Sequence, residues 1–147
     1  MKLIDFITAQ SARLKQAGVS FGHGTTNAFD EAAWLVLWSL SMPLDELESQ
    51  ARRELSGDEQ TRAEALVTRR IETRRPAAYL TREAWLQNVP FYVDERTIVP
   101  RSFIAELLAD GEGEGTLDAW LSDRTLRVLD LCTGNGSLAV IAAMAYP

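Results

Sequence analysis

Apolar residues recur at helical spacing along the first half of the chain. The first such segment runs from Leu3 to Ala17 and is followed by Gly18, a residue type that commonly ends a helix. Its apolar positions fall on one helical face, at Leu3, Ile7 and Leu14. The pattern therefore predicts a short amphipathic helix at the start of the chain.

A second helix is predicted over Ala28 to Leu40, and this segment is apolar nearly all round. Asn27 or a neighbouring threonine can cap its first turn. Its two tryptophans, Trp34 and Trp38, stand one turn apart and are expected in the core. The helix should form the buried centre of a helical bundle.

Two further helices complete the predicted bundle. One starts at Pro43, because proline is tolerated in a first turn, and its inward face is expected at Leu44, Leu47, Ala51 and Leu55. The other opens at the capping box Ser56-Gly-Asp-Glu59 and ends near Arg75, because Pro76 restricts the residue before it. Its inward positions are expected at Ala63, Leu66, Val67 and Ile71.

From Ala84 the pattern changes to aromatic and β-branched residues. Breaks at Gln87-Asn88 and at Asp94-Glu-Arg96 divide this stretch into three short runs, Trp85-Leu86, Phe91-Tyr-Val93 and Thr97-Ile-Val99. The runs predict a small hairpin or meander that links two domains.

The last part of the chain is expected to contain helices around an acidic loop, and then a strand, a turn and a helix. Ser102 can cap a helix through Ala109, and a short helix is expected around Leu117 to Leu121. An apolar strand from Leu126 then ends on Asp130, and a glycine turn opens into an alanine-rich helix near Ser137. Such a turn can hold a ligand, because its glycines let the ligand approach the backbone and the helix N–H groups point toward it.

Composition and charge narrow the class of protein. The chain has 147 residues, of which 46% are apolar, which is enough for a core in one or two small domains. Its 15 basic and 21 acidic residues give a net charge of −6, which argues against non-specific coating of nucleic acid but leaves a local basic face open. With Cys132 as the sole cysteine and His23 as the sole histidine, neither a disulfide nor a metal site is expected. The chain shows no signal peptide and no apolar run long enough to cross a membrane, so we expect a cytoplasmic protein.

The residues of the glycine turn leave two classes of ligand open. Gly134-x-Gly136-x-x-Ala139 satisfies the dinucleotide pattern, so a nicotinamide or flavin cofactor fits the spacing. Asp130 favours the alternative, because a carboxylate ahead of the glycines would repel a pyrophosphate and suits a cationic amino group. S-adenosylmethionine carries such a group.

Several motifs in the same order resemble one known family. Asp130-Leu-Cys-Thr-Gly-Asn-Gly136 resembles the first motif of the class I methyltransferases, which use such an acid for the methionine end of S-adenosylmethionine. Together with Pro76-Ala-Ala-Tyr-Leu-Thr81, Phe91-Tyr-Val-Asp94 and Val99-Pro-Arg-Ser102, it resembles the HemK-like protein glutamine N5-methyltransferases.

Within that family, the resemblance is closest to the branch that methylates a large-subunit ribosomal protein, number three. This finer resemblance is carried by His23-Gly-Thr25, Asn27-Ala28, Asp30-Glu-Ala32 and Cys132. The resemblance as a whole runs from about Phe21 to Pro147. It implies N5-methylation of a glutamine side chain by the parent protein, with S-adenosylmethionine as methyl donor and the ribosomal protein as partner.

The resemblance also implies a mostly α fold in three parts. They are a helical substrate-recognition bundle over residues 1–75, a β-hairpin linker over 76–101, and the first βα unit of a class I, Rossmann-like methyltransferase domain over 102–147. That domain is expected to be truncated here, because one βα unit is not a complete sheet. The family grips the target amide with an Asn-Pro-Pro-Tyr motif that these 147 residues lack, so no catalytic residue is assigned and this chain is expected to be inactive alone.

Candidate binding residues follow from the resemblance. The cofactor residues are expected in the turn and at one arginine ahead of it, namely Asp130, Cys132, Thr133, Gly134, Asn135, Gly136 and Arg101. Arg101 could instead pair with an acid, and Cys132 could be either an activated thiol or an inert packed residue. Candidate substrate contacts are His23, Arg69 and Arg70, and the arginine-rich fourth helix is either a solvated face or a contact with ribosomal RNA or an acidic partner.

Two other functions stay open on sequence grounds. The chain could be a non-catalytic helical adaptor that binds ribosomal protein or RNA, or part of a methyltransferase that acts on a glutamine of a peptide release factor. The lone strand over Leu126 to Leu131 has two unpaired edges, so it should pair with another chain, pack irregularly or be poorly ordered. The oligomeric state is otherwise not predicted.

Overall fold

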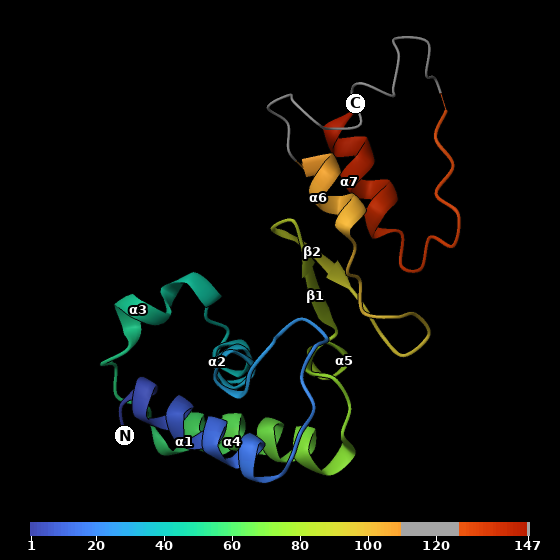
Figure 1. Cartoon of the computed structure of the whole chain (residues 1–147). Coiled ribbons are helices and arrows are strands. Elements are labelled where there is room, and N and C mark those ends of the chain that lie inside the picture. Colours follow the sequence, from blue (N-terminus) through green and yellow to red (C-terminus); the bar gives the residue numbers. More distant parts are fainter. Residues whose placement is uncertain (110–126, 147) are drawn as a thin grey trace. The chain divides into compact units, whose positions relative to one another are not determined.

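The structure, a computed structural model, describes residues 1–109 and 127–146. It divides into two compact units, Met1–Thr81 and Arg82–Pro147. The predicted fold class is confirmed, because the described residues are mostly helical and carry one two-stranded antiparallel hairpin (Figure 1). No helix among them has both the length and the apolar character to span a membrane.

The first unit is a helical bundle. Helices α1 (Leu3–Gln16), α2 (Ala28–Ser39) and α4 (Gly57–Thr73) contact one another, and Figure 1 shows α1 and α4 side by side with α2 seen nearly end-on. Each helix buries its apolar positions between the other two, and the largest fully buried side chains include Leu3, Ile7, Leu14, Leu35, Leu37 and Val67. The helical spacing of apolar residues therefore predicted this core correctly.

The predicted caps of α2 and α4 are both present. The side chain of Asn27 accepts hydrogen bonds from the backbone N–H groups of Phe29 and Asp30 at 3.0 and 2.9 Å. At the start of α4, the Ser56 hydroxyl accepts from the N–H of Glu59, and the Glu59 carboxylate accepts from the N–H of Ser56. Caps depend only on a few neighbouring residues, so the sequence was sufficient to place them.

The predicted third helix is wrong in length, and of its four expected inward residues Leu55 is buried whereas Leu44, Leu47 and Ala51 are not. The segment forms a 3-10 turn, η1 (Leu44–Glu46), and a single helical turn, α3 (Leu47–Gln50). Beyond it, the carbonyls of Ala51 and Arg53 accept hydrogen bonds from the N–H groups of Ile4 and Leu3, and Leu55 donates to Met1. These bonds hold the chain against the start of α1 and prevent the helix from continuing.

Two residues that the pattern assigns to the core lie at the surface. Trp34 is buried, whereas Trp38 is 39% exposed, and Leu44 is 45% exposed. Leu44 belongs to η1, which contacts α2. The prediction of a fully buried α2 is therefore wrong at its C-terminal end.

A short helix completes the first unit, in a segment that was predicted to belong to the linker. Helix α5 (Ala77–Thr81) follows the left-handed residue Arg74 and contacts both α2 and α4. Ala77 and Ala78 are completely buried. Their small side chains allow this close packing, which a pattern search for large apolar residues does not detect.

The second unit begins with the predicted hairpin. Strands β1 (Glu83–Leu86) and β2 (Val89–Tyr92) pair antiparallel, and the two turn residues Gln87 and Asn88 both have positive φ. A turn of that kind matches the twist of a hairpin. The third run, Thr97-Ile-Val99, forms no strand, so the structure has a hairpin and not a meander.

Two helices follow the hairpin, α6 (Phe103–Ala109) and α7 (Ser137–Ala145), and both were predicted. They contact each other, and a small apolar cluster of Ala105, Leu108 and Ile141 packs against side chains of the hairpin. The Ser102 hydroxyl accepts a hydrogen bond from the N–H of Ile104 at 3.1 Å, as expected for a cap. The predicted helix around Leu117 to Leu121 lies outside the described residues.

The strand predicted ahead of the glycine turn is absent from the described residues. Residues 127–130 have no regular secondary structure, and the side chains of Val128, Leu129 and Leu131 are largely exposed, Leu129 by 85%. A strand is stabilised by hydrogen bonds to a neighbouring strand, and no neighbour is present among these residues. Residues 127–130 thus form no strand, and their irregular, exposed backbone agrees with the expectation that a lone strand segment would pack irregularly; the helix that follows forms as predicted.

Candidate functional site

The candidate site is the turn between Asp130 and α7. Three of its residues adopt left-handed backbone conformations, with φ of 61° at Cys132, 59° at Gly134 and 82° at Gly136. Glycine takes this conformation without strain, whereas a side chain such as that of Cys132 makes it costly. The two glycines are thus explained by the backbone of the turn, independently of any ligand.

Hydrogen bonds within the turn orient its acid. The Thr133 hydroxyl donates to a carboxylate oxygen of Asp130 at 2.7 Å, and the N–H of Gly136 donates to the Thr133 carbonyl at 2.9 Å. The amide oxygen of Asn135 accepts from the N–H of Ser137 at 3.3 Å. Asp130, Thr133 and Asn135 therefore belong to one connected turn, as their candidate grouping requires.

The space beside the glycines is open. A Cβ atom built at Gly134 or Gly136 would meet no other atom within 4 Å. Gly136 itself offers no side chain to cap α7, and the N–H of Ser137 is bound by Asn135, so the turn can be approached at its two glycines. The turn therefore brings an acid, a hydroxyl and an open glycine backbone together near the start of α7.

The turn is also tied to the hairpin, a connection that sequence reasoning missed. The side-chain amide of Asn135 donates to the carbonyl of Tyr92 at 3.3 Å, and the Tyr92 hydroxyl donates to Asp94 at 3.0 Å. Arg96 donates to both oxygens of the Asp94 carboxylate through its side chain and to one of them through its backbone N–H. These bonds, mainly those from the Arg96 side chain, hold the pKa of Asp94 well below its usual range.

The motif Phe91-Tyr-Val-Asp94, followed by an arginine two residues later, was the only sequence signal for this support. The motif supports the turn through the hydrogen bond from Asn135 to Tyr92, which joins residues far apart in the sequence and exists only in the folded chain. The remaining cofactor candidates are exposed: Cys132 is a free cysteine in the turn, and Arg101 lies two residues before α6.

The candidate substrate residues of the first unit fall into two groups. His23 and Arg69 are exposed. Arg70 is only 3% exposed, and its side chain donates to Glu31 at 2.7 Å and to the Ser20 carbonyl at 2.9 Å. The expectation that Arg70 belongs to a substrate-facing basic surface is wrong, because its charge is buried and paired inside the bundle.

That buried pair holds the loop that carries His23. Arg70 binds the loop at Ser20, and Thr25 donates to the second oxygen of Glu31 at 2.9 Å. Between them, Gly22 donates to the Thr25 carbonyl at 2.7 Å. His23 is therefore displayed on a short turn that is fixed at both ends.

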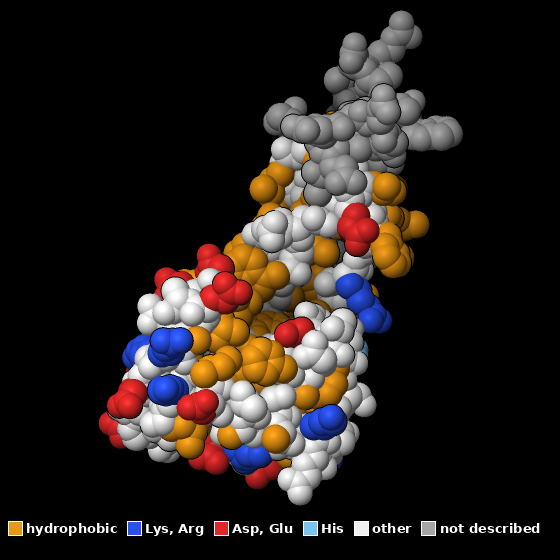
Figure 2. All heavy atoms as spheres, turned by 60° about the vertical axis from the view of Figure 1, so that its left-hand side comes forward, with side chains coloured by type: hydrophobic (Ala, Val, Ile, Leu, Met, Phe, Trp, Pro, Cys, Tyr) orange, Lys and Arg blue, Asp and Glu red, His pale blue; other side chains and the backbone are white. Residues whose placement is uncertain are grey.

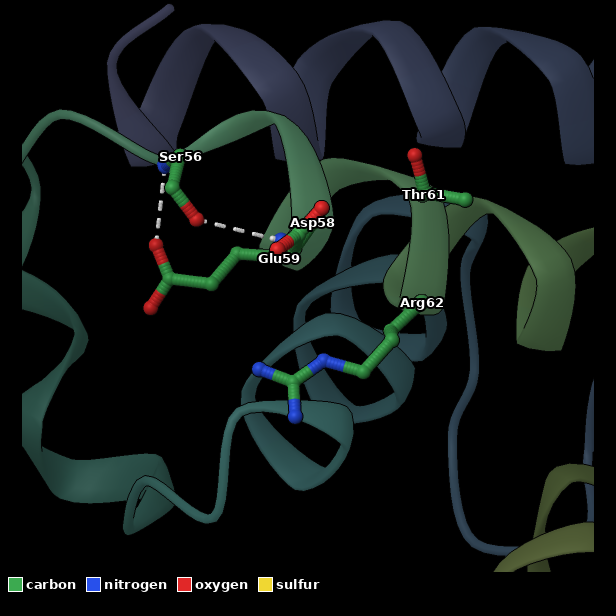
Figure 3. Close-up of a pocket in the computed structure, with 5 residues that line it drawn as sticks. All are labelled: Ser56, Asp58, Glu59, Thr61 and Arg62. Carbon is green, nitrogen blue, oxygen red and sulfur yellow. Dashed lines mark hydrogen bonds between the residues drawn. The ribbon is translucent and has the colours of Figure 1, made fainter.

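A surface hollow lies at the start of α4 (Figure 3). It is lined by Ser56, Asp58, Glu59, Thr61 and Arg62, and Figure 3 shows the Arg62 side chain extending across it. The two dashed hydrogen bonds join Ser56 and Glu59 and are those of the capping box. Its central polar groups thus serve the helix cap, so we do not assign a ligand to this hollow.

Comparison with known proteins identifies the family. Residues 5–81 match the family model described as the PrmC N-terminal domain, and the chain belongs to this family. The match covers the helical unit that the contacts within the structure define.

The curated relatives sharpen this assignment. The chain is 51% identical over 145 residues to the ribosomal protein uL3 glutamine methyltransferase of Burkholderia pseudomallei, which covers 97% of this chain and 46% of that protein. It is 47% identical over 147 residues to the protein of the same name from Bordetella pertussis, covering 99% and 48%. The chain thus spans about half the length of the curated relatives it matches, and the family resemblance seen in its motifs is confirmed.

Proposed function

We propose that this chain supplies the substrate-recognition bundle and the first cofactor-binding turn of an S-adenosylmethionine-dependent protein glutamine methyltransferase. The substrate of that enzyme is a glutamine side chain of a large-subunit ribosomal protein. The observation that carries the proposal is the identity of 51% to a ribosomal protein uL3 glutamine methyltransferase over 97% of this chain. The geometry of the turn after Asp130 agrees with it.

Each part of the turn has a role under this proposal. The carboxylate of Asp130, oriented by the Thr133 hydroxyl, suits the cationic amino group of the methionine moiety. The open backbone at Gly134 and Gly136 leaves room for the adenosine part. Asn135 keeps the turn against the hairpin through the Tyr92 carbonyl. The cofactor would supply an electrophilic methyl group.

The reaction requires the protein to orient the target amide. The nitrogen of a glutamine amide is a weak nucleophile, because its lone pair is delocalised into the carbonyl. Transfer therefore depends on holding the amide nitrogen in line with the methyl group, an orientation effect that can supply several kcal/mol, roughly 7–11 at most. In this scheme the helical unit holds the protein substrate, and His23 and Arg69 are its exposed candidate contacts.

A fusion protein tests the proposal. This chain is joined at its C-terminal end to the part of the Burkholderia pseudomallei relative that follows the matched region, and the product is incubated with purified uL3 and methyl-labelled S-adenosylmethionine. We expect label on one glutamine of uL3, located by mass spectrometry, and no label with the 147-residue chain alone. A folded fusion that binds the cofactor but leaves uL3 unlabelled would refute the substrate, and one that binds no cofactor would refute the role of the turn.

The same experiment distinguishes the methyltransferase from the alternative of a non-catalytic adaptor. If the chain is an adaptor, both the fusion protein and the 147-residue chain alone should bind uL3, and neither should transfer label to it. Replacing uL3 by a peptide release factor tests the other alternative, because label on the release factor and none on uL3 would reassign the substrate.

A further inference from the structure

The C-terminal end of α2 carries apolar side chains that no described element of the chain covers. Trp38 and Leu44 are 39% and 45% exposed, although the apolar pattern of the sequence places both in the core. The segment that follows α2 buries little, because neither η1 nor α3 contains a fully buried residue. Large apolar side chains left exposed on adjoining elements indicate an interaction surface.

The segment that carries Leu44 is acidic, and Arg53, which contacts the sulfur of Met42, has its charge paired with Glu59. Residues 42–50 contain three acids, Asp45, Glu46 and Glu48, and no basic residue. All three are exposed, and none of them forms an ion pair with another described residue. Figure 2 shows hydrophobic side chains gathered on one face of the helical unit, with both acidic and basic side chains around them.

We infer that Trp38 and Leu44, with the acids Asp45, Glu46 and Glu48, form a docking surface for a basic segment of the protein substrate. This inference rests on the proposed function. The partner follows from charge complementarity: a ribosomal protein binds RNA through lysines and arginines that neutralise phosphates, so its surface is basic. An acidic rim attracts such a segment and repels RNA.

The apolar centre and the acidic rim contribute differently. Tryptophan is over-represented among residues that dominate binding energy, because it buries a large area with few rotatable bonds. The rim acids lie in solvent, so they mainly accelerate association and make it sensitive to salt. The surface thus gives affinity through Trp38 and orientation through the acids.

Binding of this 147-residue chain to dye-labelled, purified uL3 tests the surface without requiring catalysis. Fluorescence anisotropy is measured at low and at moderate salt for the wild type, for Trp38→Ala and for Asp45→Asn/Glu48→Gln. We expect Trp38→Ala to weaken binding about tenfold or more. The double neutralisation should weaken it at low salt and flatten its salt dependence.

Glu72→Gln/Glu106→Gln is the matched control, because it removes the same charge from exposed positions of α4 and α6. It should bind uL3 within about twofold of the wild type, an effect expected of charges far from an interface. Circular dichroism melts of all variants should coincide within a few degrees, since every substituted side chain is at least partly exposed.

Two results would overturn the inference. One is equal binding by wild type and Trp38→Ala, and the other is tighter binding of a ribosomal RNA fragment than of uL3. Failure of the chain to bind uL3 at all would also overturn it while leaving the proposed function intact, because the fusion protein tests methyl transfer separately.

Discussion

Arg70 and Glu31 form an ion pair in the core of the helical unit, with 2.7 Å between the Arg70 Nε and a Glu31 carboxylate oxygen and both side chains at most 4% exposed. The pair joins α4 to the first turn of α2. Arg70 also donates to the Ser20 carbonyl, and Glu31 also accepts from the Thr25 hydroxyl. These two hydrogen bonds hold the loop that carries His23. A buried ion pair of this kind positions a loop as well as packing the core.

Replacing Arg70 by methionine should destabilise the chain strongly. The change leaves the Glu31 carboxylate buried without its partner, which typically costs about 3–5 kcal/mol. Urea unfolding followed by circular dichroism measures the loss. Arg69→Met is the matched control, because Arg69 is the exposed neighbour on the same helix, and its effect should stay within about 0.5 kcal/mol. Equal effects of the two substitutions would show that the pair does not support the bundle.

Replacing Ser56 by alanine should weaken the start of α4. The hydroxyl accepts the N–H of Glu59, and loss of such a cap costs about 1 kcal/mol. Thermal unfolding should show a melting temperature lower by several degrees. Thr61→Val serves as the control in the same helix, since its hydroxyl bonds only to a carbonyl that the helix already uses. A Ser56→Ala protein as stable as the wild type would contradict the role of the cap.

The capping box also makes stability depend on pH. Hydrogen bonds from the Ser56 N–H and then from Arg53 lower the pKa of Glu59 in the folded chain. A folded pKa below the unfolded one stabilises the protein above the unfolded pKa, and this stabilisation is lost as the pH falls through the folded pKa. Urea midpoints measured across acidic pH should fall less steeply for Glu59→Gln than for the wild type. Parallel curves would contradict the prediction.

Alanine at Gly134 and at Gly57 should have opposite effects. Gly134 has a φ of +59°, where a Cβ costs about 1–2 kcal/mol, although it would meet no neighbouring atom. Gly57 begins α4 without a positive φ and has open space around it, so alanine there should stabilise by about 0.4–1 kcal/mol. Thermal unfolding of both variants in the fusion protein tests this, and a shift in the same direction would contradict the backbone argument.

Asp130→Asn should weaken cofactor binding by the fusion protein. Asparagine can still accept the Thr133 hydroxyl, so the turn is kept while the charge that suits the methionine amino group is lost. An affinity for S-adenosylmethionine lower by about tenfold is expected, within the range for a hydrogen bond to a charged group. Isothermal titration calorimetry measures it, with Asp58→Asn in the helical unit as control. Unchanged affinity would remove Asp130 from the site.

Local features of this protein could be predicted from few residues. The caps at Asn27 and Ser56, the hairpin turn at Gln87 and Asn88, and the glycine turn ahead of α7 all depend on near neighbours along the chain. The candidate cofactor turn was located for the same reason, because its glycines, acid and hydroxyl lie within seven consecutive residues.

The sequence by itself thus determined where most helices begin, which turns form and which family the chain resembles. The tertiary structure decided the rest. Backbone bonds to the start of α1 ended the third helix, a partner on α2 buried Arg70, and Trp38 and Leu44 stayed exposed because no element of the described chain covers them. The described residues 127–130 form no strand, because strand hydrogen bonds require a neighbour that is distant in sequence, whereas a cap or a turn is formed by residues close together in the chain.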